Sequence, residues 1–222
     1  MTRHFLFVLI SITFIGCDIK SAKDYFADAE KLEQQQKYKE AISLLDKAIL
    51  KDKNFLGAYI NRGADKSAIG DYKGAIADYE KVISLDSKNT LAYFNVGNNL
   101  KRLGDNKSAV DFYNKAFNTK GGDGIYLDLQ PNSVIDLSAF DVPGHEIYYE
   151  RGIALYQIDS LNKAFSDFQN CISKNYMTAE SNYWIGNIFL VNGNKEKACE
   201  HFNKAKLLGN KDAENSIQKH CN

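Results

Sequence analysis

Gly70-Asp-Tyr-Lys-Gly-Ala-Ile-Ala-Asp-Tyr79 is followed, 34 residues later, by Gly104-Asp-Asn-Lys-Ser-Ala-Val-Asp-Phe-Tyr113. The alanine inside this stretch recurs along the chain at Ala41, Ala75, Ala109, Ala164 and Ala198. Three of the four gaps between these alanines are 34 residues, and the gap from 109 to 164 is 34 plus 21. A constant period of this length predicts an array of helical hairpins.

Side-chain size repeats with the same period. If each alanine is position 20 of its unit, the units are 22–55, 56–89, 90–123, 145–178 and 179–212. Position 8 is always small and position 24 is large, which lets two helices cross closely with no gap between them: Ala29, Gly63, Gly97, Gly152 and Gly186 face Leu45, Tyr79, Tyr113, Phe168 and Phe202. Gly70, Gly104 and Gly193 stand where the first helix of a unit must end, in the left-handed conformation that glycine favours. Each unit is predicted to be helix, turn, helix.

This pattern resembles the tetratricopeptide repeat over about 170 residues, five units of 34. The resemblance implies an all-α fold, an α-solenoid of five helix-turn-helix units with a 21-residue insertion and a C-terminal capping helix. We expect units 1–3 at 22–123, the insertion at 124–144, units 4–5 at 145–212 and the capping helix at 213–222. Such arrays present a curved binding surface instead of a pocket of catalytic groups.

Two units carry an unusual pair of charges. Position 7 is Arg62 and Arg151 in these units, and position 23 is Asp78 and Asp167. Because the two positions face each other across the hairpin, we predict a bidentate arginine–carboxylate pair in each unit. We assign these four residues to the fold and not to a ligand.

The start of the chain indicates export. Residues 1–4 form a short basic stretch, residues 5–15 form an apolar run, and Gly16-Cys17 ends the segment. Eleven apolar residues are too few to span a bilayer. The segment resembles a bacterial lipoprotein signal, which implies a signal peptide at 1–16, lipidation of Cys17, a short tether at 17–21, and anchoring at the periplasmic face or the cell surface of the envelope. Phe14 departs from the usual leucine; an ordinary cleaved signal and a cytosolic chain with an apolar start are the alternatives.

The other cysteines fit an oxidising compartment. Cys199 and Cys221 are each eleven residues from Asn210, where Gly209-Asn210 breaks the helix. Folding the terminal helix back about this break brings the two cysteines together, so we predict a disulfide, with two free thiols as the alternative. Cys171 occupies a small-residue packing position and is expected to be a buried thiol.

The insertion contains both prolines of the chain, Pro131 and Pro143. Residues 125–129 alternate as a strand does, and residues 134–137 are a candidate return strand, so a small hairpin is one interpretation. Its apolar residues, including Phe140, favour packing against neighbouring helices. A flap over the groove is the alternative, because long loops are often functional.

The resemblance places the binding groove on the concave face, lined by the first helix of each unit. Position 5 is apolar or aromatic, and positions 6 and 9 are often asparagine, a mixture that suits an extended peptide: Phe26, Ile60, Phe94, Tyr149 and Tyr183, with Asn61, Asn95, Asn98 and Asn187. Packing of position 5 against the next unit, and asparagines unrelated to a ligand, are the alternatives. A clamp for a peptide C-terminal carboxylate is not expected, because the matching positions are Leu91 and Asn95, or Glu146 and Glu150.

Charge and motif content argue against other classes of function. The chain has 28 basic and 28 acidic residues, so it lacks the basic excess of a nucleic-acid-binding protein. It has no phosphate-binding glycine motif, no His-Glu-x-x-His and no Cys-x-x-Cys. A cluster of Asp141, His145, Glu146 and Glu150 is explained by the preference of acidic residues for a first helical turn. We expect no catalytic residue, no metal and no cofactor.

These observations predict a non-enzymatic scaffold anchored by lipid at the bacterial cell envelope, with a protein or peptide in its concave groove and no nucleic-acid partner. The alternative is an accessory lipoprotein for outer-membrane protein assembly, a pilus or secretion machinery, which depends on analogy between folds. The sequence does not indicate an oligomeric state.

Overall fold

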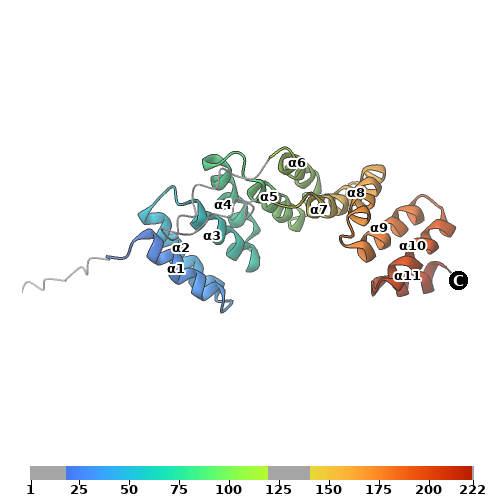
Figure 1. Cartoon of the computed structure of the whole chain (residues 1–222), viewed down its shortest axis with the longest axis horizontal. Coiled ribbons are helices and arrows are strands. Elements are labelled where there is room, and N and C mark those ends of the chain that lie inside the picture. The colour runs from blue at the N-terminus through green and yellow to red at the C-terminus, as the bar shows by residue number, and fades with distance from the viewer. Residues whose placement is uncertain (1–18, 120–140, 222) are drawn as a thin grey trace, which may run out of the picture.

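The computed structural model describes residues 19–119 and 141–221, which form eleven helices and no strand (Figure 1). They are arranged as five antiparallel pairs and a final single helix. The helices are α1 (Ala22–Glu33), α2 (Tyr38–Lys51), α3 (Leu56–Ala68), α4 (Tyr72–Leu85), α5 (Thr90–Arg102), α6 (Asn106–Phe117), α7 (Gly144–Gln157), α8 (Leu161–Ser173), α9 (Thr178–Val191), α10 (Lys195–Leu207) and α11 (Asp212–His220). The all-α solenoid predicted from the 34-residue period is confirmed.

The Gly-Asp dipeptides form the turn inside a unit. Gly70 and Gly104 have φ values of +85° and +84° and follow the ends of α3 and α5. The next residues, Asp71 and Asp105, cap the second helices, where their carboxylates accept hydrogen bonds from backbone N–H groups at 3.0 and 3.1 Å. One residue therefore ends a helix in the left-handed region, and the next starts the following helix.

Within a unit the two helices cross at position 8. A Cβ atom added to Gly97 would lie 2.7 Å from the ring of Tyr113, so the ring occupies the space that a side chain would need. In the first unit the larger Ala29 is matched by the smaller Leu45, and both are fully buried. The size of position 24 thus compensates for the size of position 8, which keeps the crossing filled.

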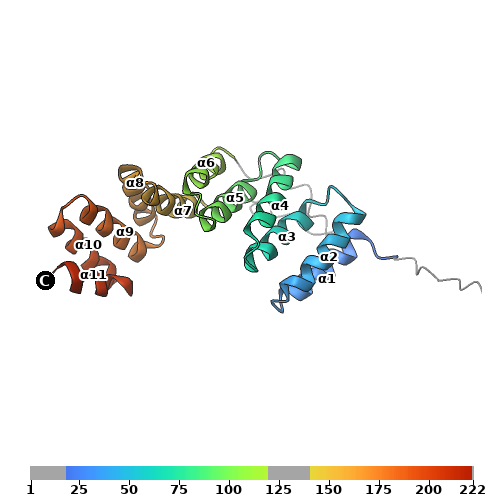
Figure 2. The same ribbon diagram turned by 180° about the vertical axis from the view of Figure 1, so that it is seen from behind.

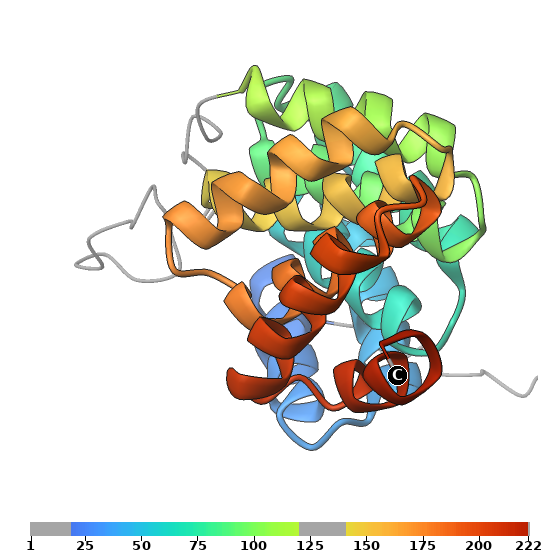
Figure 3. The same ribbon diagram turned by 90° about the vertical axis from the view of Figure 1, so that its right-hand side faces the viewer.

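The pairs stack in chain order. The second helix of each pair packs on the first helix of the next, and the first helices α5 and α7, and α7 and α9, also touch. From behind, the pairs follow one another along the long axis, with α1 and α11 at opposite ends (Figure 2). Along that axis, successive pairs are rotated about it (Figure 3). The result is a superhelix in which extensive packing is between neighbours.

Residues 141–144 close the insertion. Val142 is buried in a cluster with Tyr113, Ala116 and Ile147, so this end packs against α6 and α7. Helix α7 begins at Gly144, one residue before the predicted start of unit 4, and Pro143 occupies its N-cap. The predicted hairpin of 125–129 and 134–137, and Phe140, lie outside the described residues.

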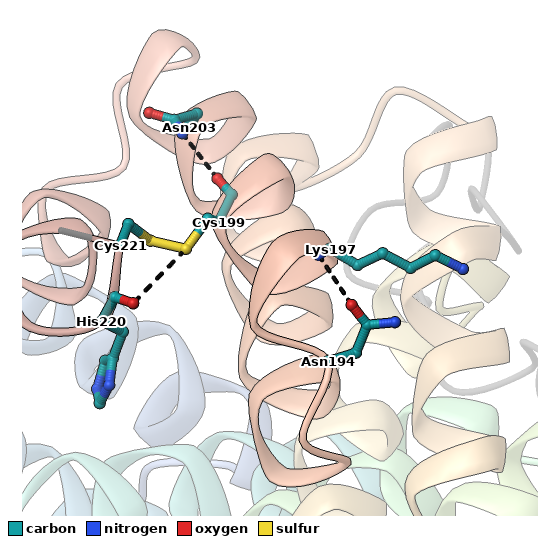
Figure 4. Close-up of a disulfide and its surroundings, with 6 residues drawn as sticks. All are labelled: Asn194, Lys197, Cys199, Asn203, His220 and Cys221. Atoms are coloured by element: carbon teal, nitrogen blue, oxygen red, sulfur yellow. Dashed lines mark hydrogen bonds between the residues drawn. A yellow bond between two sulfur atoms is a disulfide. The ribbon is translucent and has the colours of Figure 1, made fainter.

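The C-terminal helix is bound covalently to the array. Cys199 of α10 and Cys221 form a disulfide, with Cα atoms 5.6 Å apart (Figure 4). Ala213 of α11 is fully buried, and Glu214 pairs with Lys206 at 2.7 Å. Cys171 is a buried free thiol, whose pKa burial raises to about 12.

Among residues 19–119 and 141–221, every helix is too short or too polar to cross a bilayer.

Candidate functional site

Consecutive first helices meet along one line of side chains. Position 6 of each unit lies beside position 12 of the unit before it, and we call this line the first-helix seam. Its four junctions are Glu33 with Asn61, Ser67 with Asn95, Lys101 with Glu150, and Tyr156 with Trp184. Position 6 belongs to the groove predicted from the sequence, whereas position 12 does not.

The chemistry changes at each junction. At the first, the Asn61 amide donates to both Glu33 carboxylate oxygens, at 3.3 and 3.1 Å. At the third, the Lys101 ammonium forms an ion pair with Glu150. At the fourth, the rings of Tyr156 and Trp184 lie 5.1 Å apart. The seam therefore changes from acidic through polar to aromatic along the array.

The second junction is hollow. A cavity of about 500 Å³ is lined by Ala64, Ser67, Ala68, Tyr72, Tyr79, Asn95 and Arg102. A smaller one of about 190 Å³ is lined by Ser67, Asn95, Asn98, Asn99, Lys101, Arg102 and Glu150. The two share Ser67, Asn95 and Arg102, so they adjoin at this junction, and we call them together the hollow.

Three side chains in the hollow have unused hydrogen-bonding capacity. Asn99 is 2% exposed; its amide donates to the Asn95 carbonyl at 2.8 Å, while its Oδ1 has no donor within the described residues. The Asn95 side chain forms no hydrogen bond within the described part of the chain, and exposed Arg102 forms no ion pair there. An acceptor, an amide and a guanidinium are therefore free for a ligand.

Two of the predicted groove residues belong to the core. Phe26 is 2% exposed, and its ring lies 5.0 Å from that of Phe55, the N-cap residue of α3. Phe94 is 9% exposed and packs on Tyr113, with ring centroids 5.8 Å apart. The prediction that Phe26 and Phe94 line the groove is wrong, because these two side chains turn into the packing between helices.

The other position 5 residues are half-buried. Ile60 packs against the hydrophobic core formed by α1 to α5. The ring centres of Tyr149 and Phe168 are 6.2 Å apart, and those of Tyr183 and Phe202 are 5.8 Å apart. Desolvation raises the pKa of Tyr149 to about 12. These three residues keep an exposed edge and stay predicted groove residues.

Three of the four asparagines have partners inside the protein. Asn61 binds Glu33, Asn98 accepts the Tyr113 hydroxyl at 2.8 Å, and Asn187 donates to the Tyr183 carbonyl at 2.9 Å. Only Asn95 among the four has an unengaged side chain within the described residues, and it is the one that lines the hollow.

The two predicted charge pairs are present, and each has a third member. The Arg62 guanidinium donates to Asp78 at 2.9 and 2.5 Å, and that of Arg151 donates to Asp167 at 2.8 Å from two nitrogens. The third member comes from position 25 of the preceding unit: Asp46 at 2.6 Å for Arg62, and Asn114 at 2.7 Å for Arg151. Each arginine therefore joins two units as well as two helices.

The cluster near the start of α7 is dispersed among structural contacts. The His145 ring packs against the Tyr176 ring in a tilted arrangement, with centroids 4.4 Å apart, and Glu150 is paired with Lys101. Within the described ranges, no group of three or more side chains is placed to hold a metal ion. Cys17, the predicted lipidation site, lies outside those ranges.

Comparisons with known proteins agree with this architecture. A family model described as "TPR repeat" matches residues 68–104, and one described as "Tetratricopeptide repeat" matches residues 91–121 and 179–212. No curated protein matches the chain.

Several solved structures share the fold. YrrB, described as a TPR protein with an unusual peptide-binding site, is 21% identical, with a TM-score of 0.68 over 87% of this chain and 90% of its own. MamA from Desulfovibrio magneticus RS-1 is 19% identical, with a TM-score of 0.69 over 84% and 94%. PilW, described as a widely conserved type IV pilus biogenesis factor, is 15% identical, with a TM-score of 0.62 over 89% and 92%. Family models and fold agree: the chain is built from tetratricopeptide repeats.

Proposed function

We propose that this protein is a non-enzymatic scaffold that binds an extended segment of a protein partner along the first-helix seam. The hollow at the second junction is the observation that carries the proposal. It combines two adjoining cavities with a buried acceptor on Asn99, an amide on Asn95 and a guanidinium on Arg102, none of which is engaged within the described residues. A peptide backbone supplies donors and acceptors for the two asparagines, and an acidic side chain supplies a partner for Arg102.

The similar fold of YrrB, whose description includes a peptide-binding site, supports this proposal. The aromatic pair Tyr156–Trp184 at the fourth junction adds an apolar surface in line with the hollow. Peptide recognition commonly combines such aromatic anchors with a few polar groups.

Site-specific photo-crosslinking in cells tests the binding surface. A benzophenone amino acid is placed at Ser67 in the hollow or, as a matched control, at Glu80, an exposed residue of α4. We expect partner adducts from position 67 and not from position 80, and a several-fold loss when Arg102→Glu is added. Equal adducts from both positions would place the partner elsewhere.

We also propose that the protein is exported and held at the bacterial envelope by lipid on Cys17. The support is the basic start, the short apolar run and the Gly16-Cys17 junction. With a tether of only residues 17–21, the lipid would keep α1 close to the membrane surface. Metabolic labelling with an alkyne fatty acid should mark the protein, and Cys17→Ser should abolish the label. A labelled Cys17→Ser variant would contradict this assignment.

A role in pilus, secretion or outer-membrane assembly is a second candidate. PilW, a pilus biogenesis factor by its description, has the same architecture, although at 15% identity this likeness concerns the fold. Identification of the Ser67 crosslinked partner by mass spectrometry distinguishes the two. A pilin, secretin or outer-membrane barrel protein would favour this second role.

A further inference from the structure

The first junction of the seam contains carboxylates without a counter-charge. Glu30 and Glu33 of α1 and Asp65 of α3 form no ion pair within residues 19–119 and 141–221. Two nearby lysines are engaged elsewhere: Lys31 with Asp28 at 2.8 Å and Lys66 with Asp78 at 2.8 Å. The only side-chain hydrogen bonds to Glu33 within these residues come from the neutral amide of Asn61.

Asp65 is the member of this group whose burial destabilises the folded protein. It is 3% exposed, and its Oδ2 has no hydrogen-bond donor within the described residues. Burial, with a smaller contribution from Glu33, raises its pKa to about 7. A buried, unpaired carboxyl group destabilises a fold, and the same position in units 4 and 5 is filled by Ala154 and Ile188. Helix packing alone therefore does not account for an acid at position 65.

Position 65 borders the binding face. Its counterpart in the next unit is Asn99, which lines the hollow at the second junction and also has a buried, unpartnered oxygen. The charge of Glu33 contributes to the raised pKa of Asp65, so the two carboxyl groups lie in the same neighbourhood. A buried acceptor without a donor within the described residues therefore recurs at this position in units 2 and 3.

The missing partner is a cation. Desolvation also raises the pKa of Glu30 and of Glu33, and no ion pair within the described residues offsets it. Within the described residues, these acids are not grouped as metal ligands. An elongated organic cation, which can reach several carboxylates with separate N–H donors, fits better than a compact ion.

We propose that Glu30, Glu33 and Asp65 form a subsite for a lysine or arginine side chain of the bound segment. This inference rests on the proposed function, because it assigns one residue of the peptide that lies along the seam. The next junction carries Arg102, which forms no ion pair within the described ranges, so the seam is acidic beside α1 and α3 and basic at the end of α5. A bound segment therefore has a basic residue at the first junction and an acidic residue at the second, which sets its direction along the array.

Fluorescence anisotropy with the full-length protein and four labelled, end-blocked decapeptides tests the subsite. The peptides share one polar sequence and carry at two fixed places a Lys alone, a Glu alone, both a Lys and a Glu, or Gln at both. We expect the peptide with both charges to bind most tightly and the Gln peptide most weakly. Asp65→Asn should weaken the Lys-containing peptides about tenfold, the loss expected for one charge-assisted contact. The Glu-only peptide should be unaffected by Asp65→Asn and weakened by Arg102→Ala.

Asp65→Asn is a suitable variant because asparagine already occupies this position in the next unit, as Asn99. Glu80→Gln on the exposed face of α4 is the matched charge control and should leave every affinity unchanged. Unaltered Lys-peptide binding in Asp65→Asn would overturn the subsite while the Arg102 result preserves the scaffold function. Spermidine competing as well as the Lys peptide would overturn the assignment to a peptide. Absence of binding by all four peptides would reject the subsite. The crosslinking experiment at Ser67 would then test the scaffold function separately.

Discussion

Arginine at position 7 forms hydrogen bonds to two consecutive units and so links them. Arg151 bonds Asp167 within its unit and Asn114 in the unit before, and its guanidinium lies 4.5 Å from the ring centre of Phe117. The Asp167 side chain is only 4% exposed. The ion pair satisfies both buried charges, so the loss of one partner is expected to cost more than the loss of both.

Replacing Arg151 with alanine tests this dependence. The variant leaves the Asp167 carboxylate buried without a counter-charge, and we expect unfolding free energy to fall by about 3 kcal/mol. The double variant Arg151→Val, Asp167→Phe installs the apolar pair that unit 3 carries as Val96 and Phe112. Urea denaturation should show that the double variant recovers much of the loss. A double variant as unstable as the single one would contradict the pair.

Asp65 makes the free energy of unfolding fall as pH rises, whereas an ion-paired acid makes it rise. Its pKa in the folded protein, about 7, is above the ordinary value of 3.8, so the folded state binds the proton more tightly than the unfolded state. The stabilisation is fully present below about pH 4 and is lost as pH rises through 7. Relative to Asp65→Asn, the wild type should therefore lose about 1–3 kcal/mol between pH 5 and pH 8. Urea denaturation at the two pH values measures it, and a constant difference would refute the assignment.

At the scale of elements, each helix pair is defined by one close crossing. Gly97 and Tyr113 together fill the space between α5 and α6 at their crossing. Ala29 and Leu45 fill the space between α1 and α2, with a larger residue at position 8 and a smaller one at position 24. The helix ends are set separately, by positive-φ glycines such as Gly104 and by capping aspartates such as Asp105. Pair geometry and pair length are thus encoded by different residues.

Gly97→Ala should overpack the crossing of α5 and α6. The added Cβ would lie 2.7 Å from the Tyr113 ring, and we expect a loss of about 1–3 kcal/mol. Adding Tyr113→Leu recreates the combination of the first unit and should restore part of it. Gly144→Ala is the control, since its Cβ would meet Phe117 at an ordinary 3.8 Å. Chemical denaturation of the three variants ranks them; equal losses at Gly97 and Gly144 would exclude the steric explanation.

At the scale of the whole molecule, the array is linear. Extensive helix contacts join neighbours only, so stability is set by the units and by the interfaces between consecutive units. The disulfide at the C-terminal end closes a loop of 22 residues and should contribute roughly 3 kcal/mol there, through the entropy of the unfolded chain.

Reduction of Cys199–Cys221 should therefore act locally. In hydrogen-exchange mass spectrometry we expect faster exchange in α10 and α11 after reduction, a smaller change in α9, and none in α1–α4. The variant with serine at both cysteines should resemble the reduced protein and be insensitive to reductant. Faster exchange in α1–α4 would show that the array unfolds as one cooperative unit.

The sequence alone determined the features that depend on residues within one unit. The 34-residue period shows directly in the sequence. A small residue faces a large one in each unit, and arginine faces aspartate in the Arg62–Asp78 and Arg151–Asp167 pairs. The two partners of each contact are separated by a single turn, so local geometry dictates the contact. The same holds for Cys199 and Cys221, placed equally far from the helix break at Gly209-Asn210.

Only the tertiary structure decided what happens between units. The stacking of one helix pair on the next placed Phe26 of α1 against Phe55 at the start of α3, and it set position 12 beside position 6. It also left Arg102 without an ion pair and Asp65 without a donor within the described residues. Since the superhelical rotation results from the packing of many side chains at once, no single spacing in the sequence expresses it, and the surface along the first helices is a property of the folded array.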